Sequence, residues 1–158
     1  MTAWRLGMLQ HQREYVQNQI ALGDAKAAGI VAWNAVLTGS LPLVVGSGGL
    51  SASLPAALIV SAGAFLSVSF IWCFTSLFPR TPSAGGENRL SFVDFAKCSR
   101  ADFHGAMKGL SEKECERQLC DHIHLLGGIA SAKFKCLSTA IRCSGAATIL
   151  MILLIFAV

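Results

Sequence analysis

The stretch from Ala27 to Phe78 reads AAGIVAWNAVLTGSLPLVVGSGGLSASLPAALIVSAGAFLSVSFIWCFTSLF and contains no Asp, Glu, Lys or Arg. Crossing the ~30 Å hydrocarbon core of a bilayer takes about 20 apolar residues in a helix, so the stretch is long enough to cross twice. A soluble helix of this length would need a polar face, which is missing here. The cluster Gly46-Ser47-Gly48-Gly49 interrupts the run and indicates a turn. We therefore expect a transmembrane hairpin with spans over residues 27–45 and 56–78.

The remainder of the chain also indicates a membrane protein. Of its 158 residues, 14% are charged and 53% are hydrophobic, whereas about a quarter of the residues of a soluble domain are charged. The apolar C-terminal stretch predicts a third span over residues 137–158. It includes Arg142, which either extends its guanidinium to the headgroups or lines a pore or a lipid-headgroup site. The expected fold class is an all-α membrane protein with three transmembrane helices.

The basic residues predict the orientation of the chain, because Lys and Arg remain on the cytoplasmic side of a membrane. The turn between the first two spans has none, whereas residues 1–26 carry several. The segment 79–136 carries nine, namely Arg80, Arg89, Lys97, Arg100, Lys108, Lys113, Arg117, Lys133 and Lys135. The N-terminus and the middle segment should therefore be cytoplasmic and the C-terminus periplasmic. No cleavable signal peptide is expected, since the first 26 residues are polar.

The cytoplasmic parts are expected to be helical extensions of the membrane helices. Residues 1–26 should form one helix that continues into the first span, with Tyr15, Val16, Ile20 and Ala27 on one side. In the segment 79–136, two helices should cover about residues 92–109. A capping box from Ser111 to Glu114 should then start a long helix. The apolar stripe of that helix has helical spacing and comprises Leu119, Ile123, Leu126, Ala130, Phe134 and Leu137.

The sequence gives no indication of an enzyme or of a metal site. It contains no phosphate-binding loop, nucleophile elbow or His-Glu-x-x-His helix. The series Cys115, Cys120, His122, His124 matches no usual zinc spacing. No catalytic residue, metal ligand or cofactor is therefore expected.

Two other classes remain open from the residues alone. A small ion channel or transporter would use polar positions in the first span, for which the candidates are Asn34, Thr38, Ser40 and Pro42. A lone Asn in a membrane helix can also simply form a hydrogen bond to a neighbouring helix. The other class is a membrane assembly protein that binds no ligand.

Four short motifs in order along the chain resemble the transmembrane effector family of the Pycsar antiphage defence systems. Asp24-Ala25-Lys26-Ala27 is similar to the family's motif at the start of the first span, and Leu77-Phe78-Pro79-Arg80 to the motif that ends the second. The segment 90–95 is similar to the aromatic segment that follows. Residues 122–135 are similar to the amphipathic helix that ends in Lys-Tyr. Here that helix ends in Lys133-Phe134-Lys135. Two assignments of the family's lysine are therefore open, Lys133 and Lys135.

The resemblance implies an antiphage defence effector. A partner cyclase would make a cyclic pyrimidine mononucleotide, cCMP or cUMP, upon infection. The effector would respond by impairing the integrity of the cell inner membrane, which causes death or growth arrest of the infected cell. A basic cytoplasmic module suits such an anionic ligand. The expected partners are the lipid bilayer and the cyclic nucleotide, with no nucleic acid polymer.

A cyclic mononucleotide requires a cation, hydrogen-bond donors and a ring on which its base can stack. The predicted topology brings several such side chains to one level beneath the membrane. The predicted ligand-binding residues are Asp24, Lys26, Arg80, Lys133, Phe134 and Lys135. The alternative is that these cations only set the topology and that Phe134 only packs.

We also expect a homo-oligomer that assembles through the membrane helices. In the second span, Ala57 with Ser61 and Gly63 with Ser67 place small residues four positions apart. Such pairs allow close approach of helices.

The predicted topology can be checked with reporter fusions. A reporter that is active only in the periplasm should be active when fused after Val158 and silent when fused at Ser83. The reverse pattern would show that the orientation is wrong.

Overall fold

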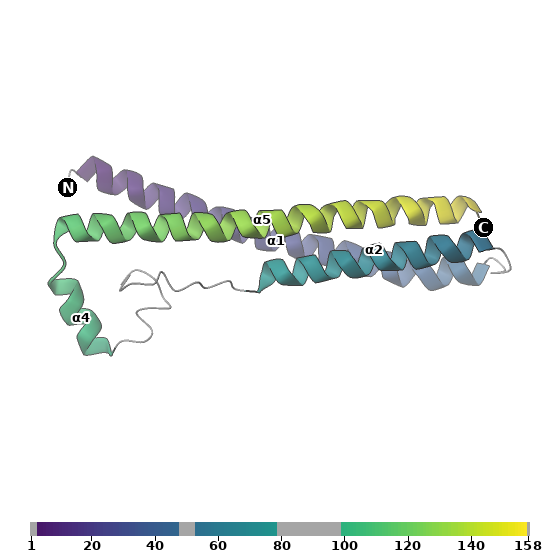
Figure 1. Cartoon of the computed structure of the whole chain (residues 1–158), viewed down its shortest axis with the longest axis horizontal. Coiled ribbons are helices and arrows are strands. Elements are labelled where there is room, and N and C mark those ends of the chain that lie inside the picture. The colour runs from purple at the N-terminus through teal and green to yellow at the C-terminus, as the bar shows by residue number, and fades with distance from the viewer. Residues whose placement is uncertain (1–2, 48–52, 79–98, 158) are drawn as a thin grey trace. The chain divides into compact units, whose positions relative to one another are not determined.

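The structure is a computed structural model, and it describes residues 3–47, 53–78 and 99–157. In these residues the helices are α1 (Ala3–Ser47), α2 (Ser53–Leu77), α4 (Arg100–Lys108) and α5 (Glu112–Ala157), and there is no strand (Figure 1). Helices α1, α2 and α5 are each long and apolar enough to cross a membrane. The predicted class, an all-α protein with three candidate membrane spans, is therefore confirmed.

Both long helices continue without a break from their polar parts into their apolar parts. α1 passes through Lys26 into the charge-free stretch and through Pro42 as well. α5 begins at Glu112 and passes through the Gly127-Gly128 pair. The expectation that the extensions and spans are continuous helices is thus confirmed. Of the two helices expected over residues 92–109, the structure describes α4, and residues 92–98 lie outside the described residues.

The helix starts follow from side-chain caps. The hydroxyl of Ser111 accepts a hydrogen bond from the backbone N–H of Glu114 (3.2 Å), as the capping box predicted. The hydroxyl of Ser99 accepts one from the backbone N–H of Asp102 (3.2 Å) at the start of α4.

The chain divides into two compact units, which share the long helices. We call residues 1–21 and 79–131 the arm unit, and residues 22–78 and 132–158 the membrane unit.

In the membrane unit, the buried positions of each helix recur at alternating steps of three and four residues. On α2 they are Ala62, Leu66, Ser69, Cys73 and Ser76. On α5 they include Leu137, Ala140, Ser144, Ala147, Met151 and Leu154, with Cys136 also buried beside Leu137, and on α1 they include Ala27, Asn34 and Leu37. This heptad spacing is typical of helices that pack at a small crossing angle with interlocking side chains. Four of these positions are alanines, which let helix backbones approach closely.

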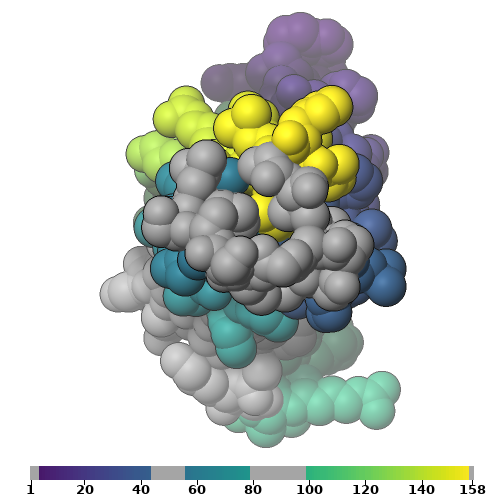
Figure 2. Space-filling view, turned by 90° about the vertical axis from the view of Figure 1, so that its right-hand side faces the viewer, coloured from purple at the N-terminus to yellow at the C-terminus, as the bar shows by residue number. Residues whose placement is uncertain are grey.

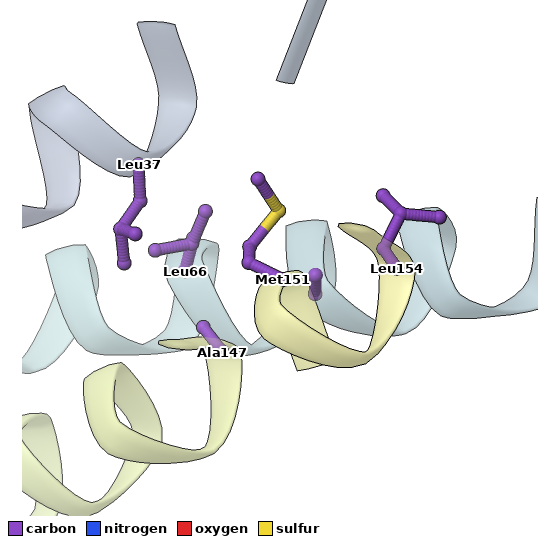
Figure 3. Close-up of a cluster of buried hydrophobic side chains, with 6 residues drawn as sticks. Leu37, Leu66, Ala147, Met151 and Leu154 are labelled. Carbon is purple, nitrogen blue, oxygen red and sulfur yellow. The ribbon is translucent and has the colours of Figure 1, made fainter. Parts of the chain in front are cut away.

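The apolar core of the membrane unit draws side chains from all three helices. Leu37 of α1, Leu66 of α2, and Ala147, Met151 and Leu154 of α5 form one cluster together with Ala62 (Figure 3). Figure 2 faces the end of the molecule where the C-terminal turns of α5 lie, drawn in yellow. The opposite faces of these helices expose large apolar side chains such as Val60, Ile71 and Phe156. A lipid-facing surface has this character, because no polar face is needed in hydrocarbon.

A hydrogen-bonded polar layer crosses the same core. The Asn34 side-chain N–H donates to the Ser69 hydroxyl (2.8 Å), which donates to the backbone carbonyl of Ala140 (2.9 Å). The Ser144 hydroxyl donates to the Asn34 side-chain oxygen (2.7 Å). Asn34, Ser69 and Ser144 are all buried. One amide thus connects all three membrane helices.

The polar residues that could have indicated a transporter are bonded within the protein. Thr38 donates to the backbone carbonyl of Asn34 (2.8 Å), and Ser40 donates to that of Leu37 (2.8 Å). Buried polar groups in a membrane must be satisfied internally. Thr38 and Ser40 are thus bonded within α1 itself, whereas Asn34 bonds to the other two membrane helices.

In the arm unit, one expectation about α1 is wrong. Tyr15, predicted to share one side with Val16 and Ile20, is 55% exposed. The half-buried side instead includes Arg13, because the heptad steps from Ile20 reach residues 16 and 13 and pass over 15.

Arg13 interacts with α5 near His122. Burial, and secondarily the charge of Arg13, lower the pKa of His122. The Arg13 Nε and the His122 Nδ1 are enclosed without a hydrogen-bond partner among the described residues. Arg13 and His122 therefore differ from the bonded Asn34 layer of the membrane unit, since each is half-buried and leaves an enclosed nitrogen atom without a described partner.

The membrane layer predicts a specific stability loss. Asn34→Ala removes two interhelical hydrogen bonds and leaves the Ser144 hydroxyl without its acceptor. We expect a loss of about 1–3 kcal/mol, since interhelical hydrogen bonds in membranes contribute about 0.6–2 kcal/mol each. Thermal unfolding in detergent micelles measures it. Ser67→Ala is the matched control, because that hydroxyl donates only within α2, to the carbonyl of Gly63. Equal stability of the two variants would contradict the role of the layer.

Candidate functional site

Five of the six predicted ligand-binding residues belong to the membrane unit. Asp24 and Lys26 lie on α1, and Lys133, Phe134 and Lys135 lie on α5. The sixth, Arg80, lies outside the described residues. The five occupy the helical turns just before the predicted first and third spans begin, at residues 27 and 137.

Asp24 and Lys133 form an ion pair between α1 and α5. The Lys133 Nζ donates to the Asp24 carboxylate at 2.5 Å. The Lys133 side chain is only 12% exposed, whereas that of Asp24 is 39% exposed. A cation at this depth depends on its partner, since a buried charge without one is costly. The positive charge of Lys133 is therefore paired with a carboxylate of the protein, whereas Lys135 is exposed. The structure thus distinguishes the two lysines that the sequence left equivalent.

Lys26 and Phe134 form a second contact between the same helices. The Lys26 Nζ lies 5.8 Å from the centre of the Phe134 ring, which is within the range of a cation–π interaction. Phe134 is half-buried, as its place in the apolar stripe of α5 predicts, while Lys26 is exposed. Packing and cation binding are therefore compatible at Phe134.

An open hollow of about 260 Å³ lies over this contact. It is lined by Lys26, Phe134, Leu137, Ser138, Ile141 and Arg142. The predicted ligand-binding residues include Lys26 and Phe134 but neither Ser138 nor Arg142, although the sequence singled out Arg142 as a residue that could line a pore or a lipid-headgroup site. The missed signal is the spacing, because residues 134, 138 and 142 are four apart and lie along one face of a helix.

The size of the hollow limits what it can bind. Sites that enclose small molecules usually have volumes of about 300–1,000 Å³. A smaller and open hollow suits one charged group, such as a phosphate, with the rest of the ligand outside it. The two basic side chains give it a positive potential.

A second open hollow, of about 390 Å³, lies in the arm unit and is lined by Ser111, Lys113, Glu114, Glu116 and Arg117. Its charges are mixed. The Arg117 guanidinium donates to both oxygens of Glu114, at 2.6 and 3.0 Å. Because Arg117 is paired in this way, the hollow attracts an external anion less strongly.

Across residues 3–47, 53–78 and 99–157, no three His, Cys, Asp or Glu side chains come close enough to hold a metal ion. Cys120 and His124 are exposed, and His122 lies against Arg13. That the protein needs no metal remains a prediction.

The structure has three candidate membrane spans with polar helical extensions, and a basic hollow beside the ion pair. These features define a small multi-pass membrane protein. The family model of the Pycsar effector protein domain matches residues 8–158. The chain therefore belongs to the Pycsar effector family and is an antiphage defence effector, which confirms the resemblance seen in the motifs. No curated protein and no solved structure matches the chain.

The ion pair predicts an asymmetric response to substitution. Asp24→Ala leaves the buried Lys133 ammonium unpaired and should lower the free energy of unfolding by about 1–3 kcal/mol. Lys133→Met retains an apolar stem and should cost less. The double variant should be more stable than the sum of the two losses implies. Thermal unfolding in micelles measures these values, with Lys135→Met as the exposed control, which should stay within about 0.5 kcal/mol of the parent. Additive losses would contradict the pairing.

Proposed function

We propose that the protein is an inner-membrane effector that responds to a cyclic pyrimidine nucleotide, cCMP or cUMP, by impairing membrane integrity. The observation that carries this proposal is the pair of contacts between α1 and α5, Asp24–Lys133 and Lys26–Phe134. Both are polar or cationic, and both lie where the two helices become apolar. An anionic ligand that competes for these cations would act directly on the packing of two membrane helices.

The proposed response is a shift between two arrangements of the helices. A ligand shifts such an equilibrium only if it binds one arrangement more tightly. The phosphate of a cyclic nucleotide would attract Lys26 and would compete with the Asp24 carboxylate for Lys133. The resting arrangement, in which the carboxylate holds Lys133, would therefore lose stability when the ligand is bound.

The polar layer offers a route from this shift to membrane damage. Asn34 lies eight residues beyond Lys26, or about 12 Å along α1. If the helices separate, the Asn34, Ser69 and Ser144 side chains lose their partners in the apolar region. Polar groups without partners in hydrocarbon attract water or each other, which would favour leakage across the bilayer or association of several copies.

Association of copies is part of the proposal. Ala57, Ser61 and Ser67 of α2 are exposed rather than buried in the core, and a Cβ added at Gly63 would meet no neighbouring atom. These small residues are thus available to a helix of a second copy. The proposed orientation, with the N-terminus in the cytoplasm and the C-terminus in the periplasm, places the cationic hollow on the side where a cyclase product would arrive.

Dye release from liposomes tests the proposed function. Liposomes that hold a self-quenched dye and the reconstituted full chain should release the dye when cCMP or cUMP is added. Lys133→Ala and Arg80→Ala should insert normally but lose the response, because removal of one charged partner at a phosphate costs about 2–5 kcal/mol.

Lys108→Ala is the matched control, since Lys108 is an exposed cation in the last turn of α4 and should not affect release. Cytidine and uridine, which lack the phosphate, should have no effect. Release that neither nucleotide stimulates would contradict the function. Release that persists in both variants would contradict the assigned residues.

A further inference from the structure

The charges of the membrane unit do not balance. Its acidic and basic residues are one acid, Asp24, and four bases, Lys26, Lys133, Lys135 and Arg142. Lys133 takes the only carboxylate. Lys26, Lys135 and Arg142 therefore have no acidic partner within the unit. Two of these three cations, Lys26 and Arg142, line the same hollow.

Arg142 is the more unusual of the two because of its depth. It lies five residues into the predicted third span, or about 8 Å along the helix from Leu137. A charged side chain within the apolar region is costly unless it is paired or reaches the interface. No carboxylate among the described residues forms an ion pair with it. An anion from outside the chain would remove this cost.

The geometry of α5 directs Arg142 toward the hollow. Side chains on a helix lean toward its N-terminus, so that Arg142 leans toward Ser138, one turn away. Phe134 lies one further turn back and carries Lys26 on its ring. The hollow thus combines a guanidinium, an ammonium, a hydroxyl and an apolar floor formed by Leu137 and Ile141.

We propose that this hollow binds a phosphodiester monoanion, with Arg142 as the main ligand. A guanidinium can form two parallel hydrogen bonds to two phosphate oxygens. Lys26 supplies the second positive charge, and the Ser138 hydroxyl donates to an ester or free oxygen. The apolar floor and the Phe134 ring contact the carbon-bearing part of the ligand.

Two molecules carry this group at the membrane surface. One is an anionic phospholipid such as phosphatidylglycerol, whose acyl chains would follow the lipid-facing side of α5. The other is a cyclic mononucleotide, and that source rests on the proposed function. The volume of about 260 Å³ suits the phosphodiester shared by both rather than an enclosed nucleotide.

The test measures binding to the purified full chain in a neutral detergent. The probes are short-chain phosphatidylglycerol, cCMP and cUMP, with cytidine and a neutral diacylglycerol as controls without phosphate. The parent should bind at least one of the phosphodiesters. Arg142→Gln should weaken that binding about 30-fold or more, which is the loss expected when one charged partner is removed.

Three further variants separate binding from folding. Arg142→Lys retains the charge without the two-pronged geometry and should weaken binding less than Arg142→Gln. Ser138→Ala should weaken binding by about three- to tenfold, which corresponds to one hydrogen bond. Lys108→Gln removes an exposed cation of α4 that does not line the hollow, and it should leave binding unchanged. Circular dichroism of each variant checks that the helices remain.

The outcomes distinguish the two sources and the two proposals. Binding of phosphatidylglycerol alone identifies a lipid site, and binding of a cyclic nucleotide alone identifies a site for the signal. If the parent binds no phosphodiester, or if Arg142→Gln binds as tightly as the parent, the inference is overturned. Nucleotide-triggered dye release with unchanged binding to Arg142→Gln would overturn the inference and leave the proposed function standing. If instead Arg142→Gln loses lipid binding and the parent shows no nucleotide-triggered release, the inference stands and the proposed function is contradicted.

Discussion

The side-chain amide of Asn34 is bonded to α2 through Ser69 and to α5 through Ser144, inside a largely apolar core. In a bilayer the hydrophobic effect does not hold helices together, because lipid is as apolar as leucine. Close packing of small residues and interhelical hydrogen bonds must do so. Because the Asn34 layer needs all three partners at one height, it also fixes the register of the three helices. The heptad core around Leu66 and Met151 depends on that register.

The same spacing of buried positions explains how one helix can serve two environments. α1 and α5 each run from a polar extension into an apolar span without a break. Steps of three and four residues keep one side of each helix buried along its length. What changes is the opposite side, which is polar in the extensions and apolar in the spans. Movement in an extension would therefore reach the span along a continuous helix, which suits the proposed response to a cytoplasmic ligand.

The boundary between these two regions is where charge is concentrated. Asp24 neutralises Lys133 there, while Lys26 rests on Phe134 and Arg142 approaches from the apolar side. An ion pair between helices is stable only while neither partner has a better alternative. A phosphodiester offers such an alternative to the cations. The membrane unit is thus held by a fully bonded layer at one level and by an ion pair open to competition at another.

The amino-acid sequence by itself determined the helical class and the three candidate spans, because the charge-free stretch from Ala27 to Phe78 and the apolar C-terminal stretch permit few other folds. The short motifs along the chain indicated the family. It also indicated where the candidate site lies, since cations gather at the ends of membrane helices. Only the tertiary structure decided which of Lys133 and Lys135 is paired, that Ser138 lines the hollow and that Asn34 bonds to two helices. These features depend on the rotation and register of neighbouring helices. Several small buried residues allow more than one such register, and hydropathy alone does not choose among them.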